Sequence, residues 1–234
     1  MRCTLLAGSA CSEEQLSFFR KNLPGNHFMM AYGLSEMAPV SETLYEDTDE
    51  HLKKTVGRQV DNIQIRIRDR ETGRECATGE AGEIIVQGYQ LMTGYYKLPL
   101  KDQAIDEDGW LLTGDMGYLR EDGYLVLTGR YKDLIVRGGE NIMPLEVEQA
   151  VSSLEEVEDV KVIGVPNAFY GEEVCACVKL KKGASWDENE ARVALRSCLA
   201  PYKIPSRFVL FDTFPLLGSG KIDIVSMKEK VLMQ

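Results

Sequence analysis

The sequence has no pair of cysteines at the spacing of a zinc site. Its only two histidines could add little, and its six cysteines include no Cys-x-x-Cys pair: Cys3, Cys11, Cys76, Cys175, Cys177 and Cys198. Structural zinc sites use four cysteine or histidine ligands at short spacings, so we do not expect this kind of site. Cysteines without a disulfide pattern are typical of a reducing compartment, which predicts free thiols and a cytoplasmic protein.

The sequence also lacks an excess of basic residues. The chain carries 27 Lys and Arg against 37 Asp and Glu, a net charge of -10, which argues against a nucleic-acid partner. A single nucleotide can still be held by backbone N–H groups and one or two cations.

No run approaches the ~18 apolar residues of a membrane helix, and the apolar stretch after Arg2, of about six residues, is shorter than the core of an export signal. We expect neither export nor a membrane span.

The first part of the chain, 1–52, has the pattern of an α/β layer. Residues 4–7 predict a short strand that ends at Gly8, residues 12–15 have capping-box spacing before a helix, and the apolar run 27–31 predicts a second strand. Two short strands do not make a stable parallel sheet. Either other segments pair with them or the chain has lost its beginning.

The segment 53–130 changes to a period of two. Ile63, Ile65 and Ile67 alternate with polar residues, and apolar strands are predicted at 82–87, 110–115 and 118–128 with glycine-containing turns between them. Several short strands at this spacing predict a small antiparallel β-barrel or curled sheet.

The remaining segment, 134–234, combines helices and strands. Pro144 is placed to begin a helix, strands are predicted at 160–165 and 174–180, and a capping box at 185–188 predicts a further helix. Cys175 and Cys177 alternate in an apolar run and should face one side of a strand as small apolar residues. With a strand at 207–211 and a last helix from Asp223, this segment reads as a compact α+β domain, and the whole chain as mixed α/β.

Five motifs occur in a fixed order along the chain. They are YGLSE (32–36), GEAGEIIVQG (79–88), GWLLTGD (109–115), GRYKDLIVRGGENIMPLEVE (129–148) and GSGKID (218–223). Together they resemble the acyl-adenylate-forming superfamily, which includes acyl-CoA synthetases, peptide-synthetase adenylation domains and luciferases. The resemblance covers nearly the whole chain and is greatest to the acyl-CoA synthetases.

The resemblance implies a ligase that joins a carboxylic acid, fatty or another small organic acid, to the thiol of CoA through an acyl-adenylate made from ATP with Mg²⁺. It also implies that 1–130 is the C-terminal part of a large AMP-binding domain, that 131–133 is a hinge containing Asp133, and that 134–234 is a mobile domain.

The same resemblance assigns roles in nucleotide binding. Tyr32 corresponds to the ring that lies against adenine, and the segment Gly8, Ser9 and Ala10 to the chain on the other side of the base. Ser35, where relatives usually have Thr, would reach a phosphate oxygen. Glu36 corresponds to the Mg²⁺ ligand, since a carboxylate suits a hard cation that also touches phosphates.

Further roles follow for the later motifs. Asp115 corresponds to the acid that accepts hydrogen bonds from both ribose hydroxyls, and Arg130 to a ribose or phosphate contact. Lys221 corresponds to the catalytic cation at the reacting carboxylate and α-phosphate. The loop that would lie against the pantetheine arm comprises Gly138, Gly139, Glu140 and Asn141.

Each of these residues also has a purely structural interpretation. Tyr32 could be a core aromatic residue, Glu36 could begin a helix, and Asp115 and Ser35 could cap turns. Arg130, Asp133 and Lys221 could be surface charges, and the glycine loop an ordinary hairpin.

The chain departs from the family in one important respect. The Gly/Ser/Thr-rich phosphate loop that ends in lysine, which relatives carry well before YGLSE, is absent, and family chains are around twice as long. We therefore expect a truncated chain that is inactive alone. Its bared apolar surface, around Leu5, Leu6, Phe28 and Met29, would favour self-association. Two alternatives stay open: an adenylation enzyme that loads an amino or aryl acid onto a carrier protein, and an inactive fragment.

Overall fold

A computed structural model describes residues 2–8, 13–99 and 104–233. The chain forms two compact units, Met1–Tyr131 and Lys132–Gln234. The division between them falls within the short 3-10 helix η2, Tyr131–Asp133. None of the helices in the described ranges has the length and apolar character that a membrane crossing requires.

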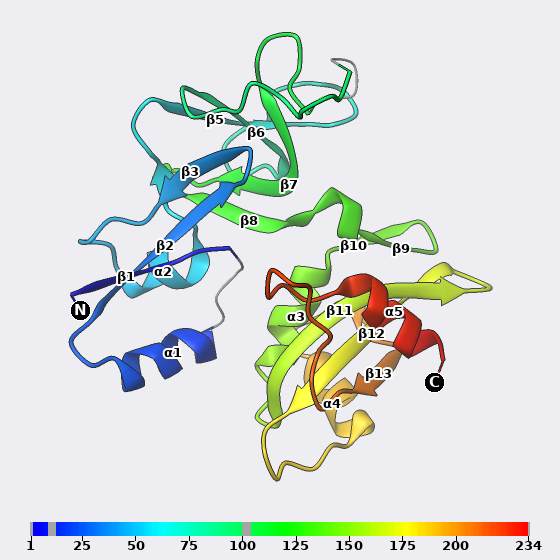
Figure 1. Cartoon of the computed structure of the whole chain (residues 1–234). Coiled ribbons are helices and arrows are strands. Elements are labelled where there is room, and N and C mark those ends of the chain that lie inside the picture. The colour runs from blue at the N-terminus through cyan, green and yellow to red at the C-terminus, as the bar shows by residue number, and fades with distance from the viewer. Residues whose placement is uncertain (1, 9–12, 100–103, 234) are drawn as a thin grey trace. The chain divides into compact units, whose positions relative to one another are not determined.

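The first sheet of the first unit contains the predicted strand–helix–strand segment. Strand β1 (Cys3–Leu6) pairs in parallel with β2 (His27–Leu34), and α1 (Glu13–Asn22) connects them (Figure 1). Antiparallel pairing with β3 (Met37–Glu42), and of β3 with β4 (Arg58–Gln59), extends the sheet to four strands. These additional strands give the short parallel pair the support that it needs.

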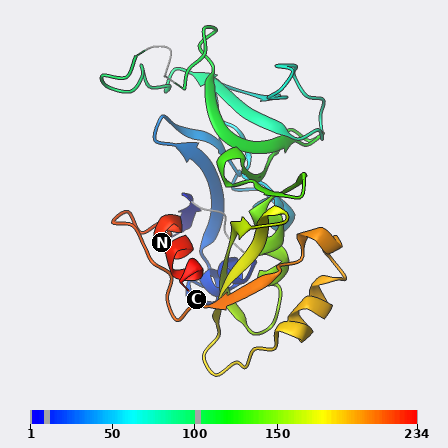
Figure 2. The ribbon, with the colours of Figure 1, turned by 90° about the vertical axis from the view of Figure 1, so that its right-hand side faces the viewer.

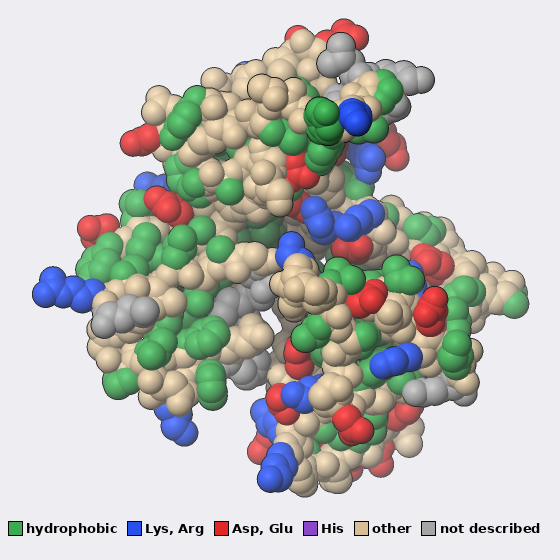
Figure 3. All heavy atoms as spheres, viewed as in Figure 1, with side chains coloured by type: hydrophobic (Ala, Val, Ile, Leu, Met, Phe, Trp, Pro, Cys, Tyr) green, Lys and Arg blue, Asp and Glu red, His purple; other side chains and the backbone are tan. Residues whose placement is uncertain are grey.

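Alternation along β2 decides which of its side chains are buried. Phe28 and Met30 point inward and pack with Leu16 of α1 and Leu52 of α2 (Asp49–Lys54). The expectation that Phe28 lies on a bared surface is therefore wrong, because the pleat turns it into this core. Leu5 of β1, by contrast, is 53% exposed. Apolar side chains are visible at the surface over β1 and α1 in Figure 3.

The second sheet of the first unit is antiparallel and open. It consists of β5 (Ile63–Arg68), β6 (Gly82–Gly88), β7 (Leu111–Leu119) and β8 (Leu125–Arg130), paired in that order. The predicted inward face is confirmed, since Ile63, Ile65 and Ile67 are buried. The predicted closure into a barrel is wrong: within the described residues β5 and β8 do not pair. Four strands are too few to close into a barrel.

The second unit is a sheet covered by helices on both faces. The strands are β9 (Ile135–Arg137), β10 (Glu140–Ile142), β11 (Val157–Asn167), β12 (Gly171–Leu180) and β13 (Arg207–Leu210). The helices are α3 (Pro144–Ser152), α4 (Glu188–Leu195), the 3-10 helix η3 (Pro201–Lys203) and α5 (Ile224–Leu232). The sheet has the order β10-β9-β12-β11, with β13 parallel to β12. Helix α5 lies on one side of β11 and β12, and helix α4 on the other (Figure 2).

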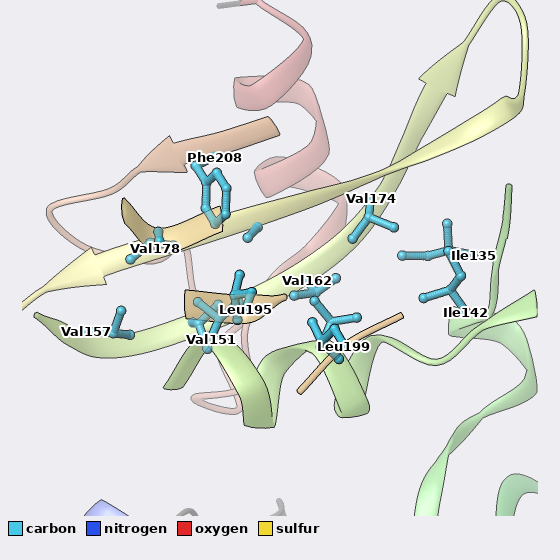
Figure 4. Packing of buried hydrophobic residues seen from close by; sticks show 14 residues of the cluster. Ile135, Ile142, Val151, Val157, Val162, Val174, Val178, Leu195, Leu199 and Phe208 are labelled. Atoms are coloured by element: carbon cyan, nitrogen blue, oxygen red, sulfur yellow. The ribbon is translucent and has the colours of Figure 1, made fainter. Parts of the chain in front are cut away.

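Strand β12 contributes to two separate cores. Val174 and Val178 face α3 and α4, in the cluster that includes Leu195 (Figure 4). Cys175 and Cys177 face the opposite way and pack against α5, which confirms that they act as small apolar residues of one face. The hydrogen bond to Cys175, together with burial, raises the pKa of the Cys177 thiol, so Cys177 is not a ready nucleophile.

The N-terminus of α4 differs from the prediction. The side chain that caps the helix is Asp187, which accepts from the backbone N–H groups of Asn189 and Glu190. The capping box predicted to begin at Ser185 is therefore wrong by two residues. Asp and Ser are both good N-cap residues, and spacing alone did not distinguish them.

Replacing Leu195 by Ala tests the core of the second unit. Leu195 is fully buried, so we expect a loss of about 2–5 kcal/mol in the free energy of unfolding from lost burial and the cavity left behind. Urea denaturation measures it. Val193→Ala, at a position of the same helix that is 63% exposed, is the control and should change the stability by less than about 0.5 kcal/mol. Equal effects of the two substitutions would contradict this packing.

Candidate functional site

A buried carboxylate, Asp115, lies where the two sheets of the first unit meet. Asp115 in β7 is only 7% exposed and is the cross-strand neighbour of Arg130 in β8. Its Oδ1 accepts a hydrogen bond from Arg130 Nε, and its Oδ2 accepts one from the Tyr32 hydroxyl at 2.7 Å. One side chain from each sheet therefore holds the carboxylate.

The backbone around Asp115 is fixed by its neighbours in β7. The Thr113 hydroxyl donates to the Ile84 carbonyl at 2.7 Å and accepts from the Asp115 backbone N–H at 3.0 Å. Gly114 between them has a φ of 69°, a conformation that favours glycine. At Thr-Gly-Asp the register of β7 with β6 shifts, and the hydrogen bonds of Thr113 orient the backbone that carries the carboxylate.

Tyr32 is a neutral hydrogen-bond donor to Asp115. It is 8% exposed and belongs to the core shared by the two sheets. Burial, followed by the negative charge of Asp115, raises the pKa of the Tyr32 phenol well above its ordinary value. The contact with Asp115 was not foreseen from the sequence. The adenine-facing role of Tyr32 remains a prediction.

Ser35 and Glu36 form the two-residue turn of the β2–β3 hairpin, since Leu34 pairs with Met37. Glu36 therefore does not begin a helix. Its carboxylate is half-buried and accepts a hydrogen bond from the Tyr95 hydroxyl, which raises the pKa of that phenol, as does burial. Ser35 is exposed.

The residues around Glu36 fit a magnesium ion held partly by substrate. The described residues contain no group of three or more His, Cys, Asp or Glu side chains that could hold a metal. Mg²⁺ commonly takes one or two carboxylates and completes its shell with water and phosphate oxygens. A single carboxylate at Glu36 suits that arrangement and not a cage made by the protein alone.

A hollow of about 570 Å³ in the first unit connects several of these residues. Glu36 and Arg130 both line it, together with Thr113 and Gly114, the two residues before Asp115. Four charged or polar side chains in its lining were missed by the sequence analysis: Arg68, Arg70, Glu83 and Tyr95. Glu83 had a signal, because a carboxylate in the apolar run of β6 is unusual. No feature of the sequence pointed to Arg68, Arg70 or Tyr95, and only the folded chain places them at the hollow.

In the second unit, Gly138 and Gly139 form the two-residue turn between β9 and β10. Their φ values of 59° and 88° are those of the hairpin turn that glycine favours. The Gly138 N–H donates to the Tyr170 carbonyl at 2.9 Å, and a Cβ at Gly138 would lie 3.1 Å from the Tyr170 ring. The loop is therefore a hairpin, with Glu140 and Asn141 exposed at its second strand.

Three of the remaining predicted residues, Lys221, Asp133 and Gly8, are at the surface. Lys221 is exposed on the turn before α5, where its carbonyl accepts from the Leu217 N–H at 2.8 Å. Asp133 is exposed at the end of η2. Gly8 follows β1 with a φ of 87°, whereas Ser9 and Ala10 lie outside the described residues. The structure thus brings Tyr32, Glu36, Asp115 and Arg130 together within the first unit.

Comparison with known families gives two matches. Residues 1–96 match the AMP-binding enzyme family, and residues 146–221 match the AMP-binding enzyme C-terminal domain.

Individual relatives agree with these matches. The chain is 37% identical over 234 residues to a putative acyl-CoA synthetase, YngI, of Bacillus subtilis, covering 99% of this chain and 43% of the relative. It is 35% identical to the mitochondrial medium-chain acyl-CoA ligase ACSF2 of Macaca fascicularis, covering 99% of this chain and 38% of the relative. The chain thus spans less than half the length of these relatives.

A solved structure shows the same architecture. The crystal structure of ATP-bound MatB from Rhodopseudomonas palustris matches with a TM-score of 0.88 and 30% identity, covering 97% of this chain and 44% of MatB.

Replacing Tyr32 by Phe tests the contact with Asp115. At pH 8 we expect a loss of about 1.5–3 kcal/mol in the free energy of unfolding, because a buried hydrogen bond to a charged group is removed. The difference in stability between the two proteins should shrink above pH 10. Tyr32 then ionises in the unfolded chain but not in the folded chain, where its pKa is raised. This ionisation stabilises the unfolded state of the native sequence alone, because the variant has no hydroxyl at position 32.

Urea denaturation at pH 8 and pH 10.5 measures both effects. Tyr89→Phe, at a position that is 75% exposed, is the control. A stability difference for Tyr32→Phe that is the same at both pH values would show that the hydroxyl does not carry the contact.

Proposed function

The chain belongs to the AMP-binding enzyme family, and on this premise we propose that it is part of an acyl-CoA synthetase. Such an enzyme uses ATP to convert a carboxylic acid to an acyl-adenylate and then transfers the acyl group to the thiol of CoA. The observation that carries the proposal is the buried carboxylate of Asp115, held by Tyr32 and Arg130 beside the hollow that Glu36 lines.

Asp115 is suited to bind a ribose. An ionised carboxylate is acceptor-only and has about four lone-pair sites. Two of these are used by Tyr32 and Arg130, which leaves two for the 2′ and 3′ hydroxyls of a nucleotide. Arg130 forms an ion pair with the carboxylate, and its other N–H groups would reach the ribose or a phosphate.

Other residues of the first unit would bind the rest of ATP. Tyr32 and the segment Gly8–Ala10 would flank adenine, Ser35 would contact a phosphate oxygen, and Glu36 would ligate Mg²⁺. A bound Mg²⁺ would neutralise charge on the phosphates. ATP as a substrate is supported by the ATP-bound state of the MatB structure.

Residues of the second unit would act on the reacting groups. Lys221 would place an ammonium at the charge that develops between the carboxylate and the α-phosphate. The Gly138–Asn141 hairpin would offer close backbone approach to the pantetheine arm, and Asp133 would be the hinge. The exposed position of all these residues supports roles toward external ligands.

The acid is a fatty acid in this proposal. One relative is named a medium-chain acyl-CoA ligase, and another, from Bacillus subtilis and 39% identical, a long-chain-fatty-acid–CoA ligase. The five cysteines among the described residues are free, which favours a reducing compartment such as the cytoplasm. Exposed Leu5, Phe18 and Leu23 would promote self-association of the isolated chain.

Asp115→Asn tests the ribose contact in this chain. We expect the affinity for AMP to fall by about tenfold or more, which corresponds to 1.4 kcal/mol or more, because the charged acceptor is lost. The affinity for 2′,3′-dideoxy-AMP should be the same in both proteins. Titration calorimetry measures both ligands. Asp108→Asn, an exposed turn residue, is the control. Equal losses for the two ligands would refute a ribose contact.

Lys221→Ala tests the catalytic role. In an enzyme that combines this chain with the rest of the family's large domain, we expect adenylate formation to slow by about 10²–10³-fold. Transfer from a supplied acyl-adenylate to CoA should be retained. Lys230→Ala, an exposed lysine of α5, is the control. Loading of a carrier protein without any acyl-CoA product would instead favour the adenylation enzyme.

A further inference from the structure

We propose that Arg70 and Tyr131 form a clamp that fixes the start of η2 to the first unit, so that the linker between the two units begins at Lys132. Both residues of the clamp belong to the first unit. The proposal narrows the hinge expected at 131–133 to Lys132 and Asp133. It goes beyond the proposed function, which gives Arg70 no role.

Strand β8 fixes the chain as far as Arg130. The backbone of Arg130 pairs across the sheet with Asp115, and its side chain forms an ion pair with the same residue. The end of a strand is where a sheet opens most easily, because fewer contacts hold it. A contact made just after Arg130 therefore decides how far the ordered chain extends.

Tyr131 makes such a contact. Its side chain is half-buried against the first unit. Burial, followed by the negative charge of Glu83 in β6, raises the pKa of the Tyr131 phenol, whereas the positive charge of Arg70 acts in the opposite direction. The phenol is therefore neutral at physiological pH. The face of a neutral tyrosine ring attracts a cation.

Arg70 provides that cation. Its guanidinium carbon lies over the Tyr131 ring, 4.8 Å from the centroid, which is within the range of a cation–π contact. Arg70 is exposed and forms no ion pair with a carboxylate of the described residues. The Tyr131 ring, and not a charged group, therefore orients this side chain.

A hydrogen-bonded turn presents Arg70 to the ring. Asp69 Oδ1 accepts from the backbone N–H groups of Glu71 at 3.1 Å and Thr72 at 2.7 Å. The Asp69 N–H donates to the Arg74 carbonyl at 2.8 Å, which closes the turn. Because the backbone on both sides of Arg70 is already ordered, the stack costs only the freedom of the side chain.

The contacts that order the chain end at Tyr131. Lys132 and Asp133 are exposed, and their side chains form no hydrogen bond or ion pair with the part of the chain that the structure describes. The division between the two units also falls between Tyr131 and Lys132. The clamp is therefore the last attachment of this segment to the first unit.

The position of the clamp protects the candidate site. A backbone rotation at Lys132 or Asp133 would redirect the second unit and leave Arg130 on Asp115. Without the clamp the rotation would begin at Tyr131, next to Arg130, and would pull on that ion pair. The clamp thus separates movement of the second unit from the residues around Asp115.

Hydrogen exchange of the η2 amides in the whole chain, followed by NMR, tests the clamp. In Arg70→Gln we expect these amides to exchange about two- to fivefold faster, because an exposed cation–π contact is lost. Tyr131→Leu should have at least the same effect, and Tyr131→Phe, which keeps a ring, should exchange like the native chain. Arg196→Gln, which removes the same charge from an exposed position at the end of α4, is the control and should have no effect.

A double variant decides whether the contact itself carries the effect. Arg70→Gln combined with Tyr131→Leu should exchange no faster than Tyr131→Leu alone, because both substitutions remove one shared contact. Three results would overturn the clamp: unchanged η2 exchange in Arg70→Gln, independent effects that multiply in the double variant, or an equal increase in β7. The last result would show that the substitution weakens the whole sheet.

The exchange experiment contains no ligand, so its outcome is separate from that of the proposed function. Faster η2 exchange in Arg70→Gln without a ribose-dependent effect of Asp115→Asn would support the clamp and count against the nucleotide site. A ribose-dependent effect with unchanged η2 exchange would refute the clamp and leave the proposed function standing.

Discussion

The buried carboxylate of Asp115 is the constraint on which the first unit depends. Removing a charge from water is expensive unless partners replace the lost hydration, and breaking such an arrangement commonly costs about 3–5 kcal/mol. Tyr32 comes from the sheet of β1–β4 and Arg130 from the sheet of β5–β8. The carboxylate is satisfied only when both sheets are in register with one another.

In the proposed function, the same contacts would serve both stability and binding. The core that contains Tyr32, Met37 and Leu111 fixes the position of the two sheets. The Asp115 carboxylate is a polar group next to this core, bonded to the Tyr32 hydroxyl. A ligand that adds two hydroxyl donors would complete the hydrogen-bonding capacity of this carboxylate. Because the candidate site is built on strands, we expect the proposed nucleotide binding to need little reorganisation.

The second unit places its functional candidates differently. Its two cores fix β12 between α3 and α4 on one face and α5 on the other. The Gly138–Gly139 turn and Lys221 are exposed on segments attached to that rigid layer. Exposed turns on a packed scaffold are where groups that act on external ligands are commonly found.

Local patterns were sufficient to predict much of this protein. Period-two alternation placed Ile63, Ile65 and Ile67 on an inward face, Pro144 marked a helix start, and the motifs predicted the family. These features depend on neighbours in the sequence. The α4 cap shows the limit of the method, since Asp187 and Ser185 are equally good local candidates and only the path of the chain selects one.

Tertiary structure alone decided the rest. Whether the strands of 53–130 closed into a barrel depended on which strands pair, and β5 and β8 stay at the two edges of the sheet in the described residues. The burial of Phe28 depended on the packing of α1 and α2. The partners of Asp115 are 83 and 15 residues away along the chain, and Arg68 reaches the hollow only because β5 ends there. Hydrogen bonds and ion pairs between distant segments leave no period or spacing in the sequence, so only the folded chain reveals them.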